Sequence, residues 1–192
     1  MLKHLRAAAF LDRDGVLNEA PLRDGMPTSP ASLAELRVLA GVAEACSRLK
    51  QAGFLLVMVT NQPDIARGKT TAAIVEEINR ALQHQLELDH VYVCPHDDAD
   101  QCDCRKPKPG LLLEAARRWD IDLSASVMVG DRVRDIDAGR AAGCRTVYID
   151  HGYRELPPPH ADMSAPSLAA AAPAIIAGDI GRPPNEAAGL PR

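Results

Sequence analysis

The sequence has few aromatic residues and little surplus charge. Of its 192 residues 3% are aromatic, with two Phe, one Trp and three Tyr, and the formal net charge at pH 7 is −4. Few rings are therefore available to stack on bases, and no broad cationic surface is expected for nucleic acid or an anionic membrane. We expect no nucleic-acid partner, and the composition argues against a 3′-phosphatase acting on nucleic acid.

Long hydrophobic runs are also missing. The apolar run near the start of the chain stops at Asp12, which makes it too short for the core of a signal peptide. No stretch reaches the roughly eighteen consecutive apolar residues of a membrane-spanning helix. We therefore expect a cytoplasmic protein with no membrane partner.

Cysteine is scarce and unevenly placed. Three of the five cysteines lie within residues 94–104, and the other two are Cys46 and Cys144. The count is odd, and Cys102 and Cys104 are too close in sequence for an easy disulfide, so a disulfide framework is not expected. Cys46 lies on an apolar helix stripe and Cys144 precedes an apolar run, so both are predicted to be buried thiols.

The chain does contain a series of short apolar runs that alternate with helical patterns. The runs lie at residues 7–12, 54–60, 91–94, 126–130 and 146–150. Because they lack polar alternation, they are typical of strands covered on both faces. Apolar spacings of three and four predict helices at about residues 42–52, 74–85 and 112–119. This alternation predicts an α/β fold with a single Rossmann-like parallel sheet flanked by helices.

The length and the 46% hydrophobic content suit one domain with its own core. We assign residues 1–178 to this domain. Residues 156–192 hold eight of the fifteen prolines. Within them, residues 167–177 are predicted to form a docked helix that breaks near Pro173, and residues 179–192 are predicted to be a flexible tail.

Acidic, hydroxyl and amide side chains follow three of the predicted strands. They are Asp12, Asp14, Thr60, Asn61, Asp131 and Asp135. Because ligands of open α/β sheets collect beyond the carboxyl ends of the strands, we expect these side chains to converge. Paired carboxylates can hold a divalent cation and divide the work of nucleophile and proton carrier. The alternatives are a solvated turn and, for Asp131 and Asp135, capping of the following helix.

Four soft metal ligands lie within eleven residues: Cys94, His96, Cys102 and Cys104. Each pair is spaced by one residue, so an extended backbone places both members on one side. Joined by a polar loop, the two pairs can close a tetrahedron around Zn²⁺ without an open position for water, which favours a structural site. Such a site would hold the loop still and set where Arg105 and Lys106 emerge. The alternative is a loop of reduced cysteines.

Four motifs together resemble the haloacid dehalogenase superfamily of phosphohydrolases. They are DRDGVLN, VMVTNQPDIARG, CRKPKPG and VGDRVRD, within a match that covers about residues 7–150. More narrowly, TNQ with IARG and the cysteine block resemble the D-glycero-D-manno-heptose 1,7-bisphosphate phosphatases and the related histidinol-phosphate phosphatases. Only about 25 residues separate Gly15 from the helix near Gly41. The resemblance therefore implies a capless fold with a zinc-binding loop and an open site.

The resemblance also implies a division of roles among the acids. Asp12 is the expected nucleophile and forms an aspartyl phosphate. Asp14 is expected to protonate the leaving oxygen and then to deprotonate water, which typically contributes ~10²- to 10⁴-fold. Mg²⁺ would be held by Asp12, the backbone carbonyl of Asp14 and Asp131, with Asp135 in the outer shell.

The remaining roles concern the phosphate and the rest of the substrate. By the same resemblance, Thr60 and the backbone amides near Asn61 would bind phosphoryl oxygens. Lys106 would neutralise charge on the transferring group, and Arg105 would bind substrate. Ordinary solvated cations are the alternative for Arg105 and Lys106.

Two departures from the family pattern bear on the substrate. Pro63-Asp64 replaces the usual Ser-Gly after TNQ, and residues 18–33 replace a short Asp-His-Gly-Tyr segment. Arg23 and Gly25 are expected to supply contacts there, and Arg67 is expected to touch substrate phosphate, with a solvated turn as the alternative. The loops expected to set specificity are residues 18–33, 61–69 and 94–106.

The expected reaction is Mg²⁺-dependent removal of the 7-phosphate of D-glycero-D-manno-heptose 1,7-bisphosphate. Histidinol-phosphate hydrolysis on the same scaffold is one alternative. A zinc-stabilised binding module that has lost catalysis is another, although the retained acids and lysine argue against it. The expected partner is a small phosphorylated sugar, and a monomer is the favoured state.

Overall fold

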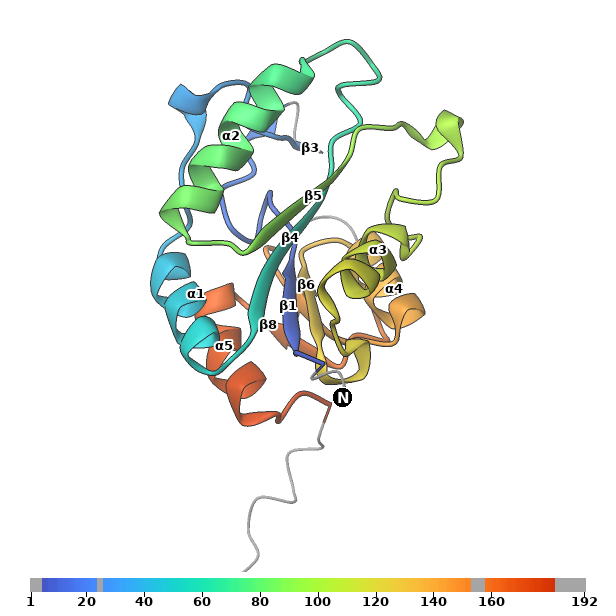
Figure 1. The fold of residues 1–192 in the computed structure, drawn as a ribbon. Coiled ribbons are helices and arrows are strands. Elements are labelled where there is room, and N and C mark those ends of the chain that lie inside the picture. The colour runs from blue at the N-terminus through green and yellow to red at the C-terminus, as the bar shows by residue number, and fades with distance from the viewer. Residues whose placement is uncertain (1–4, 24–25, 153–157, 182–192) are drawn as a thin grey trace, which may run out of the picture.

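The computed structural model describes residues 5–23, 26–152 and 158–181, and a six-stranded sheet forms its centre (Figure 1). The strands follow the order β5-β4-β1-β6-β7-β8, and all neighbouring pairs are parallel. Their bounds are β1 Ala8–Leu11, β4 Leu55–Asn61, β5 His90–Cys94, β6 Val127–Gly130, β7 Arg145–Ile149 and β8 Met163–Ala165. The predicted parallel α/β fold is confirmed.

Helices cover both faces of this sheet (Figure 1). One face carries α1 Val42–Gln51, α2 Ala72–Gln85 and α5 Leu168–Ala177, and the other carries α3 Gly110–Trp119 and α4 Val133–Ala142. Each face has its own buried hydrophobic cluster, one including Ile78 and Cys46 and the other Leu112 and Cys144. The two predicted buried thiols are thus confirmed. All four residues of β1 are buried, as expected of a strand covered on both sides.

The order of the strands decides where a ligand can bind. From β1 the chain moves outward through β4 to β5, and it then returns to the other side of β1 as β6. In open α/β sheets, ligands bind beyond the carboxyl ends of the strands at such a reversal. The residues that directly follow the two strands flanking the reversal are Asp12 and Asp131.

The C-terminal part differs from expectation in two respects. The sequence does not predict β8, because its three residues include a serine and form no apolar run. The predicted helix break near Pro173 is wrong, since α5 continues through it. Proline removes one backbone hydrogen bond, but α5 buries Leu168 and Ile175 in the core, which holds the helix together. Ile180 joins that core, whereas residues 182–192 of the predicted tail lie outside the described residues.

The segment between β1 and α1 contains small elements. A hairpin pairs β2 Leu22–Arg23 with β3 Met26–Pro27, and a 3-10 turn follows at Leu33–Glu35. Further 3-10 turns lie at Asp98–Asp100 and Leu123–Ala125. Across the described ranges no domain-sized insertion interrupts the fold, in agreement with the expected capless architecture. Gly25, for which a substrate contact is predicted, lies outside the described residues.

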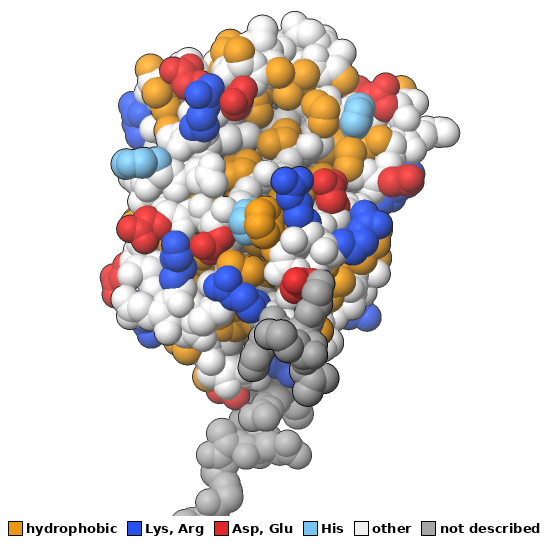
Figure 2. All heavy atoms as spheres, viewed as in Figure 1, with side chains coloured by type: hydrophobic (Ala, Val, Ile, Leu, Met, Phe, Trp, Pro, Cys, Tyr) orange, Lys and Arg blue, Asp and Glu red, His pale blue; other side chains and the backbone are white. Residues whose placement is uncertain are grey.

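Charges of both signs are mixed on the surface. On the face drawn in Figure 2, Lys and Arg side chains are interspersed with Asp and Glu, and no large patch of one sign is visible. Among the described helices, none has the length and apolar character that crossing a membrane requires.

Candidate active site and metal centres

Three strand ends meet at one cavity of about 400 Å³. Asp12 follows β1, Thr60 lies near the end of β4, and Asp131 follows β6, and all three line the cavity. Lys106 joins them from the loop between β5 and α3. The structure therefore brings together residues that are distant in the sequence.

A buried acidic cluster lies in this cavity. One carboxylate oxygen from each of Asp12, Asp131 and Asp135 lies within 4.8 Å of the other two. Lys106 is 1% exposed, and its Nζ lies 2.9 Å from Asp12 Oδ1 and 2.6 Å from Asp135 Oδ1. The same nitrogen donates to the carbonyl oxygen of Val59 at 2.8 Å. The ammonium group is thus held between two carboxylates in a fixed position.

The charges of this cluster do not balance. Three carboxylates face one ammonium, so the fully ionised cluster carries two excess negative charges. Burial raises the pKa of Asp131 to about 9, and the nearby Asp12 and Asp135 add to the effect. Burial also raises the pKa of Asp12 to about 7, although Lys106 opposes the shift. The oxygen ligands and the surplus charge fit a divalent cation such as Mg²⁺.

Two glycines make room for the acids. Gly15 has a φ of +84°, and a Cβ there would overlap the carboxylate of Asp131. A Cβ at Gly130 would overlap the side chain of Asp135. Asp135 also accepts a hydrogen bond from the backbone N–H of Arg132 at 3.0 Å. Capping of α4 and membership of the acidic cluster therefore coexist in one residue.

The carboxylate of Asp14 is held by donors from four residues. Arg13 Nη2, Ser29 Oγ and Gln62 Nε2 donate to Oδ2 at 3.0, 2.7 and 3.0 Å. Asn18 Nδ2 donates to Oδ1 at 2.9 Å. Burial acts to raise the pKa of Asp14, but Arg13 and the side-chain hydrogen bonds outweigh it and lower the pKa. The free protein thus keeps Asp14 ionised.

Asn61 and Lys106 form a reciprocal pair. Asn61 Nδ2 donates to the backbone carbonyl of Lys106 at 3.0 Å, and the Lys106 N–H donates to Asn61 Oδ1 at 3.1 Å. This pair joins the end of β4 to the segment that follows the cysteines. The side chain of Asn61 therefore holds the lysine segment in place, and Asn61 also lines the cavity.

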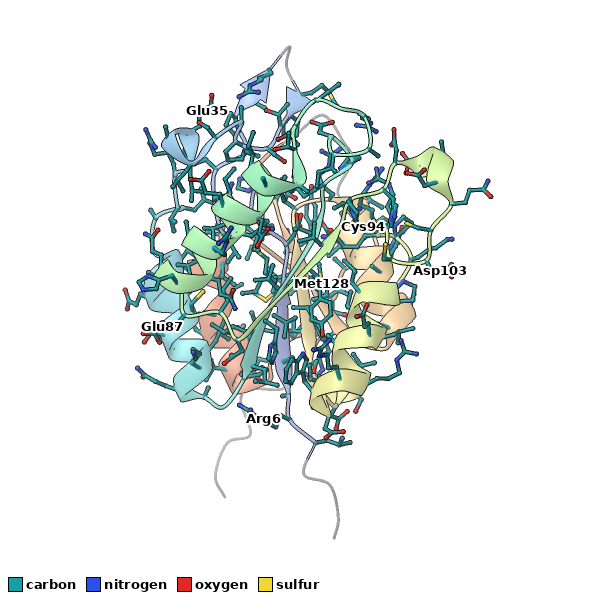
Figure 3. All side chains as sticks on the ribbon, turned by 45° about the horizontal axis from the view of Figure 1, so that its top comes forward. Arg6, Glu35, Glu87, Cys94, Asp103 and Met128 are labelled. Carbon is teal, nitrogen blue, oxygen red and sulfur yellow. The ribbon has the colours of Figure 1, made fainter. Side chains whose placement is uncertain are left out.

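The four predicted zinc ligands converge between β5 and α3. Cys94 is the last residue of β5 (Figure 3). The loop that follows contains Asp103, an exposed residue between Cys102 and Cys104 whose side chain points outward (Figure 3). The Sγ atoms of Cys94, Cys102 and Cys104 lie 3.2, 3.4 and 3.6 Å apart, and His96 Nδ1 lies 3.3 and 3.7 Å from two of them. Tetrahedral zinc, with bonds of about 2.0–2.3 Å, separates its ligands by roughly 3.3–3.8 Å. The donor set fits zinc, and the observed separations of 3.2–3.7 Å lie close to this range.

Comparison with known proteins agrees with this geometry. A model of the family described as haloacid dehalogenase-like hydrolase matches residues 26–143. The chain belongs to this family. A D-glycero-beta-D-manno-heptose-1,7-bisphosphate 7-phosphatase from Pseudomonas aeruginosa is 37% identical over 180 residues, which cover 89% of this chain and 98% of the relative. One with the same name from Bordetella bronchiseptica is 41% identical over 148 residues, which cover 74% and 80%.

Two solved structures are similar to most of the chain. The crystal structure of D,D-heptose 1,7-bisphosphate phosphatase from B. bronchiseptica, complexed with magnesium and phosphate, matches with a TM-score of 0.77 and 33% identity, covering 90% of this chain and 99% of that one. The crystal structure of a protein from Mesorhizobium loti, described as a HAD-like phosphatase, matches with a TM-score of 0.75 and 29% identity, covering 94% of this chain and 90% of that one. The chain is a phosphatase of the haloacid dehalogenase-like family.

Sequence reasoning missed the side chains that hold Asp14 in this hydrolase. Arg13 is fully buried, and its Nη1 donates to Asn79 Oδ1 at 2.9 Å. Alternation of side chains in an extended segment would direct Arg13 away from Asp14, so it gave no cue for their contact. Ser29 and Gln62 also carry no local cue, because each lies on a separate loop and reaches Asp14 only in the folded chain.

The cations around the cavity of this hydrolase are largely paired. Arg67 binds Asp97 through two nitrogens at 2.6 and 2.7 Å. Arg105 Nε lies 2.6 Å from Asp98 Oδ1. Both acids belong to the loop that carries the zinc-ligand set, so Arg67 ties this loop to the segment after β4, whereas Arg105 and Asp98 are paired within the loop. A substrate anion that binds either arginine must compete with a carboxylate.

Arg23 lies beside the main cavity. Its Nη2 contacts Glu35 Oε2 at 2.6 Å, and it lines an adjoining cavity of about 410 Å³ that also includes Ser29. Two cations that sequence reasoning did not select, Arg132 and Arg134, line the main cavity instead. They belong to the start of α4, where the VGDRVRD motif enters the helix.

Proposed function

We propose that the protein hydrolyses a phosphate monoester through an aspartyl phosphate formed on Asp12. The observation that carries the proposal is the convergence of Asp12, Asp131, Asp135 and Lys106 in one cavity. An oxygen of Asp12 attacks phosphorus while the bond to the leaving oxygen breaks. Water then attacks the aspartyl phosphate, which releases inorganic phosphate and restores the carboxylate. Dividing one displacement into two lowers the barrier of each.

Asp14 is proposed to carry the proton. It gives a proton to the leaving oxygen in the first step and takes one from water in the second. In the free protein Arg13 and the neighbouring donors lower the pKa of Asp14, which suits the second role. A bound phosphate dianion beside Asp14 opposes its ionisation, which favours the protonated form that the first role needs.

Lys106 and Thr60 are proposed to bind the transferring phosphoryl group. Lys106 already lies 2.9 Å from Asp12 Oδ1, so its charge faces the point at which the new bond forms. Thr60 Oγ1 accepts a hydrogen bond from Gln62 at 3.0 Å. Because a hydroxyl can accept and donate at once, its hydrogen is free for a phosphoryl oxygen. Fixed donors of this kind stabilise developing charge without reorganisation.

Mg²⁺ is proposed as the cation of the acidic cluster. Asp12, Asp131 and the backbone carbonyl of Asp14 would hold it, with Asp135 in the outer shell. The ion would supply the positive charge that lets a carboxylate and a phosphate dianion approach each other. Within the chain, the close packing around Gly15 and Gly130 keeps these carboxylates together.

The proposed substrate is D-glycero-D-manno-heptose 1,7-bisphosphate, from which the 7-phosphate is removed. The names of the relatives from P. aeruginosa and B. bronchiseptica support this choice. The cavity is also lined by Arg105 and Arg67, which lie outside the acidic cluster and could bind a second phosphate. We assign Arg105 to this role, with Arg67 and Arg23 as further substrate contacts.

A panel of phosphate esters tests the substrate. Phosphate release with Mg²⁺ is measured for both anomers of the heptose bisphosphate, for histidinol phosphate and for a generic aryl phosphate. We expect one heptose anomer to have the highest kcat/KM, by at least about tenfold. A higher kcat/KM for histidinol phosphate would identify that ester as the substrate instead. Absence of phosphate release from every ester would contradict the phosphatase mechanism.

The cysteine cluster is proposed to hold structural Zn²⁺ that positions Arg105 and Lys106. We expect Cys104→Ser to lower bound zinc, the free energy of unfolding and kcat/KM together, because the loop of acids and polar residues has little apolar surface to hold it. Zinc content is measured by mass spectrometry, with Mg²⁺ present throughout. Cys144→Ser, a buried cysteine outside the cluster, is the control and should keep its zinc. Unchanged stability and kinetics in zinc-free Cys104→Ser would contradict the proposal.

A further inference from the structure

The amide of Gln62 connects two groups of the active site. The side chain is 1% exposed. Its Nε2 donates to Asp14 Oδ2 at 3.0 Å and to Thr60 Oγ1 at 3.0 Å. An amide nitrogen carries two hydrogens, so both are used. One atom therefore determines the separation between the proton carrier and the phosphate-binding hydroxyl.

The orientation of this amide is determined by its surroundings. Turned the other way, the carbonyl oxygen of Gln62 would face the carboxylate of Asp14, and two acceptors would be in contact. In the observed orientation that oxygen lies 3.1 Å from Ser29 Oγ. Ser29 in turn donates to Asp14 Oδ2 at 2.7 Å. Gln62, Ser29 and Asp14 thus form a closed triangle of polar contacts.

The backbone of Gln62 is also anchored. Its N–H donates to the carbonyl oxygen of Cys94 at 2.7 Å, which joins the end of β4 to the end of β5. Its carbonyl oxygen accepts from the N–H of Ile65 at 3.3 Å. With both the main chain and the side chain held, Gln62 has little freedom to move, which a residue that orients others requires.

We propose that Gln62 is a positioning residue that aims the Asp14 carboxylate at the leaving oxygen, with Ser29 supporting it from the opposite loop. The inference rests on the proposed role of Asp14 as proton donor. Without the amide, Asp14 keeps its contacts with Arg13, Asn18 and Ser29 but loses the one donor that also contacts Thr60. Its carboxylate then turns away from the leaving oxygen.

The dependence of the rate on the leaving group tests this role. An alkyl ester needs a proton on its leaving oxygen, whereas p-nitrophenolate departs without one. For Gln62→Met we expect kcat/KM to fall by about 10- to 100-fold on an alkyl phosphate and by less than about 3-fold on p-nitrophenyl phosphate. Because kcat/KM reports only the steps up to aspartyl phosphate formation, hydrolysis of that intermediate does not enter the comparison.

Variants at Ser29 provide a second test in case Gln62→Met does not fold. Ser29→Ala should shift the alkyl-to-aryl ratio in the same direction, and Ser29→Thr, which keeps the hydroxyl, should restore it. Gln83→Met is the matched control, because Gln83 in α2 donates to the carbonyl of Leu88 away from the cavity. Its ratio should equal that of the wild type.

The outcomes separate this inference from the proposed function. If Gln62→Met and Ser29→Ala lose activity equally on both esters, or lose none, Gln62 does not position Asp14. If Gln62→Met fails to fold, the alkyl-to-aryl ratios of kcat/KM for Ser29→Ala and Ser29→Thr provide the same test. If Asp12→Asn remains active on both esters, the aspartyl phosphate mechanism itself is wrong, whatever the ratios are.

Discussion

Replacing Asp12 with Asn is expected to lower phosphate release by about 10⁴- to 10⁶-fold, the size of effect found when an enzyme loses its nucleophile. Asn has nearly the shape of Asp but lacks the anionic oxygen that attacks phosphorus. It also keeps an acceptor for Lys106, whose Nζ lies 2.9 Å from Asp12 Oδ1. The variant should therefore stay folded. Initial rates on the preferred ester and thermal unfolding measure the two properties.

Asp64→Asn is the matched control for this substitution. Asp64 lines the same cavity but lies outside the acidic cluster, where it contacts Arg67 Nη1 at 3.4 Å. We expect it to keep most of the activity on an aryl phosphate. If Asp12→Asn retained a rate within about tenfold of the wild type, another group would have to be the nucleophile.

Replacing Lys106 with Met is expected to remove activity and to lower the free energy of unfolding by about 3–5 kcal/mol. The side chain is 1% exposed and contacts Asp12 and Asp135 at 2.9 and 2.6 Å. Its removal leaves two buried carboxylates without their counter-ion, and that uncompensated charge accounts for most of the loss. Denaturant unfolding without divalent cations measures the change.

The loss should grow as the pH rises. Burial raises the pKa of Asp131 from an ordinary 3.8 to about 9, and that of Asp12 to about 7. Loss of Lys106 removes the interaction that opposes the shift of Asp12. The folded state then binds more protons than the unfolded chain, so stability falls with increasing pH between about pH 4 and pH 9. We expect Lys106→Met to lose less free energy of unfolding, relative to the wild type, at pH 5.5 than at pH 8.

A double variant shows whether charge is the cause. Adding Asp135→Asn to Lys106→Met removes one of the orphaned carboxylates, so the double variant should be more stable than Lys106→Met alone at pH 8. A double variant less stable than both single variants would point to lost packing of the lysine stem instead. A loss independent of pH would also contradict the electrostatic explanation.

The strands and the acids at their ends could be predicted because their cues are local. A run such as FLLVMVT is apolar throughout, and its position before polar residues marks the carboxyl end of a buried strand. The cysteine block is equally local, since four ligands of the right type lie within eleven residues. These features can therefore be predicted from short stretches of sequence.

Other predictions failed where distant packing dominates. Pro173 is a local signal for a helix break, but the buried face of α5 holds the helix through it. β8 has no apolar run, and its place at the edge of the sheet follows from pairing with β7. In both cases a tertiary contact outweighs the propensity of a few residues.

The sequence by itself determined the α/β alternation, the acids at the strand ends and the ligand spacing of the cysteine loop, because each depends on residues close along the chain. The tertiary structure alone decided what surrounds those groups. Gln62 and Ser29 reach Asp14 across 48 and 15 positions, and Arg67 meets Asp97 across 30. Contacts of this kind depend on where the packing of the sheet and helices places the loops, and a local pattern of residues does not predict those positions.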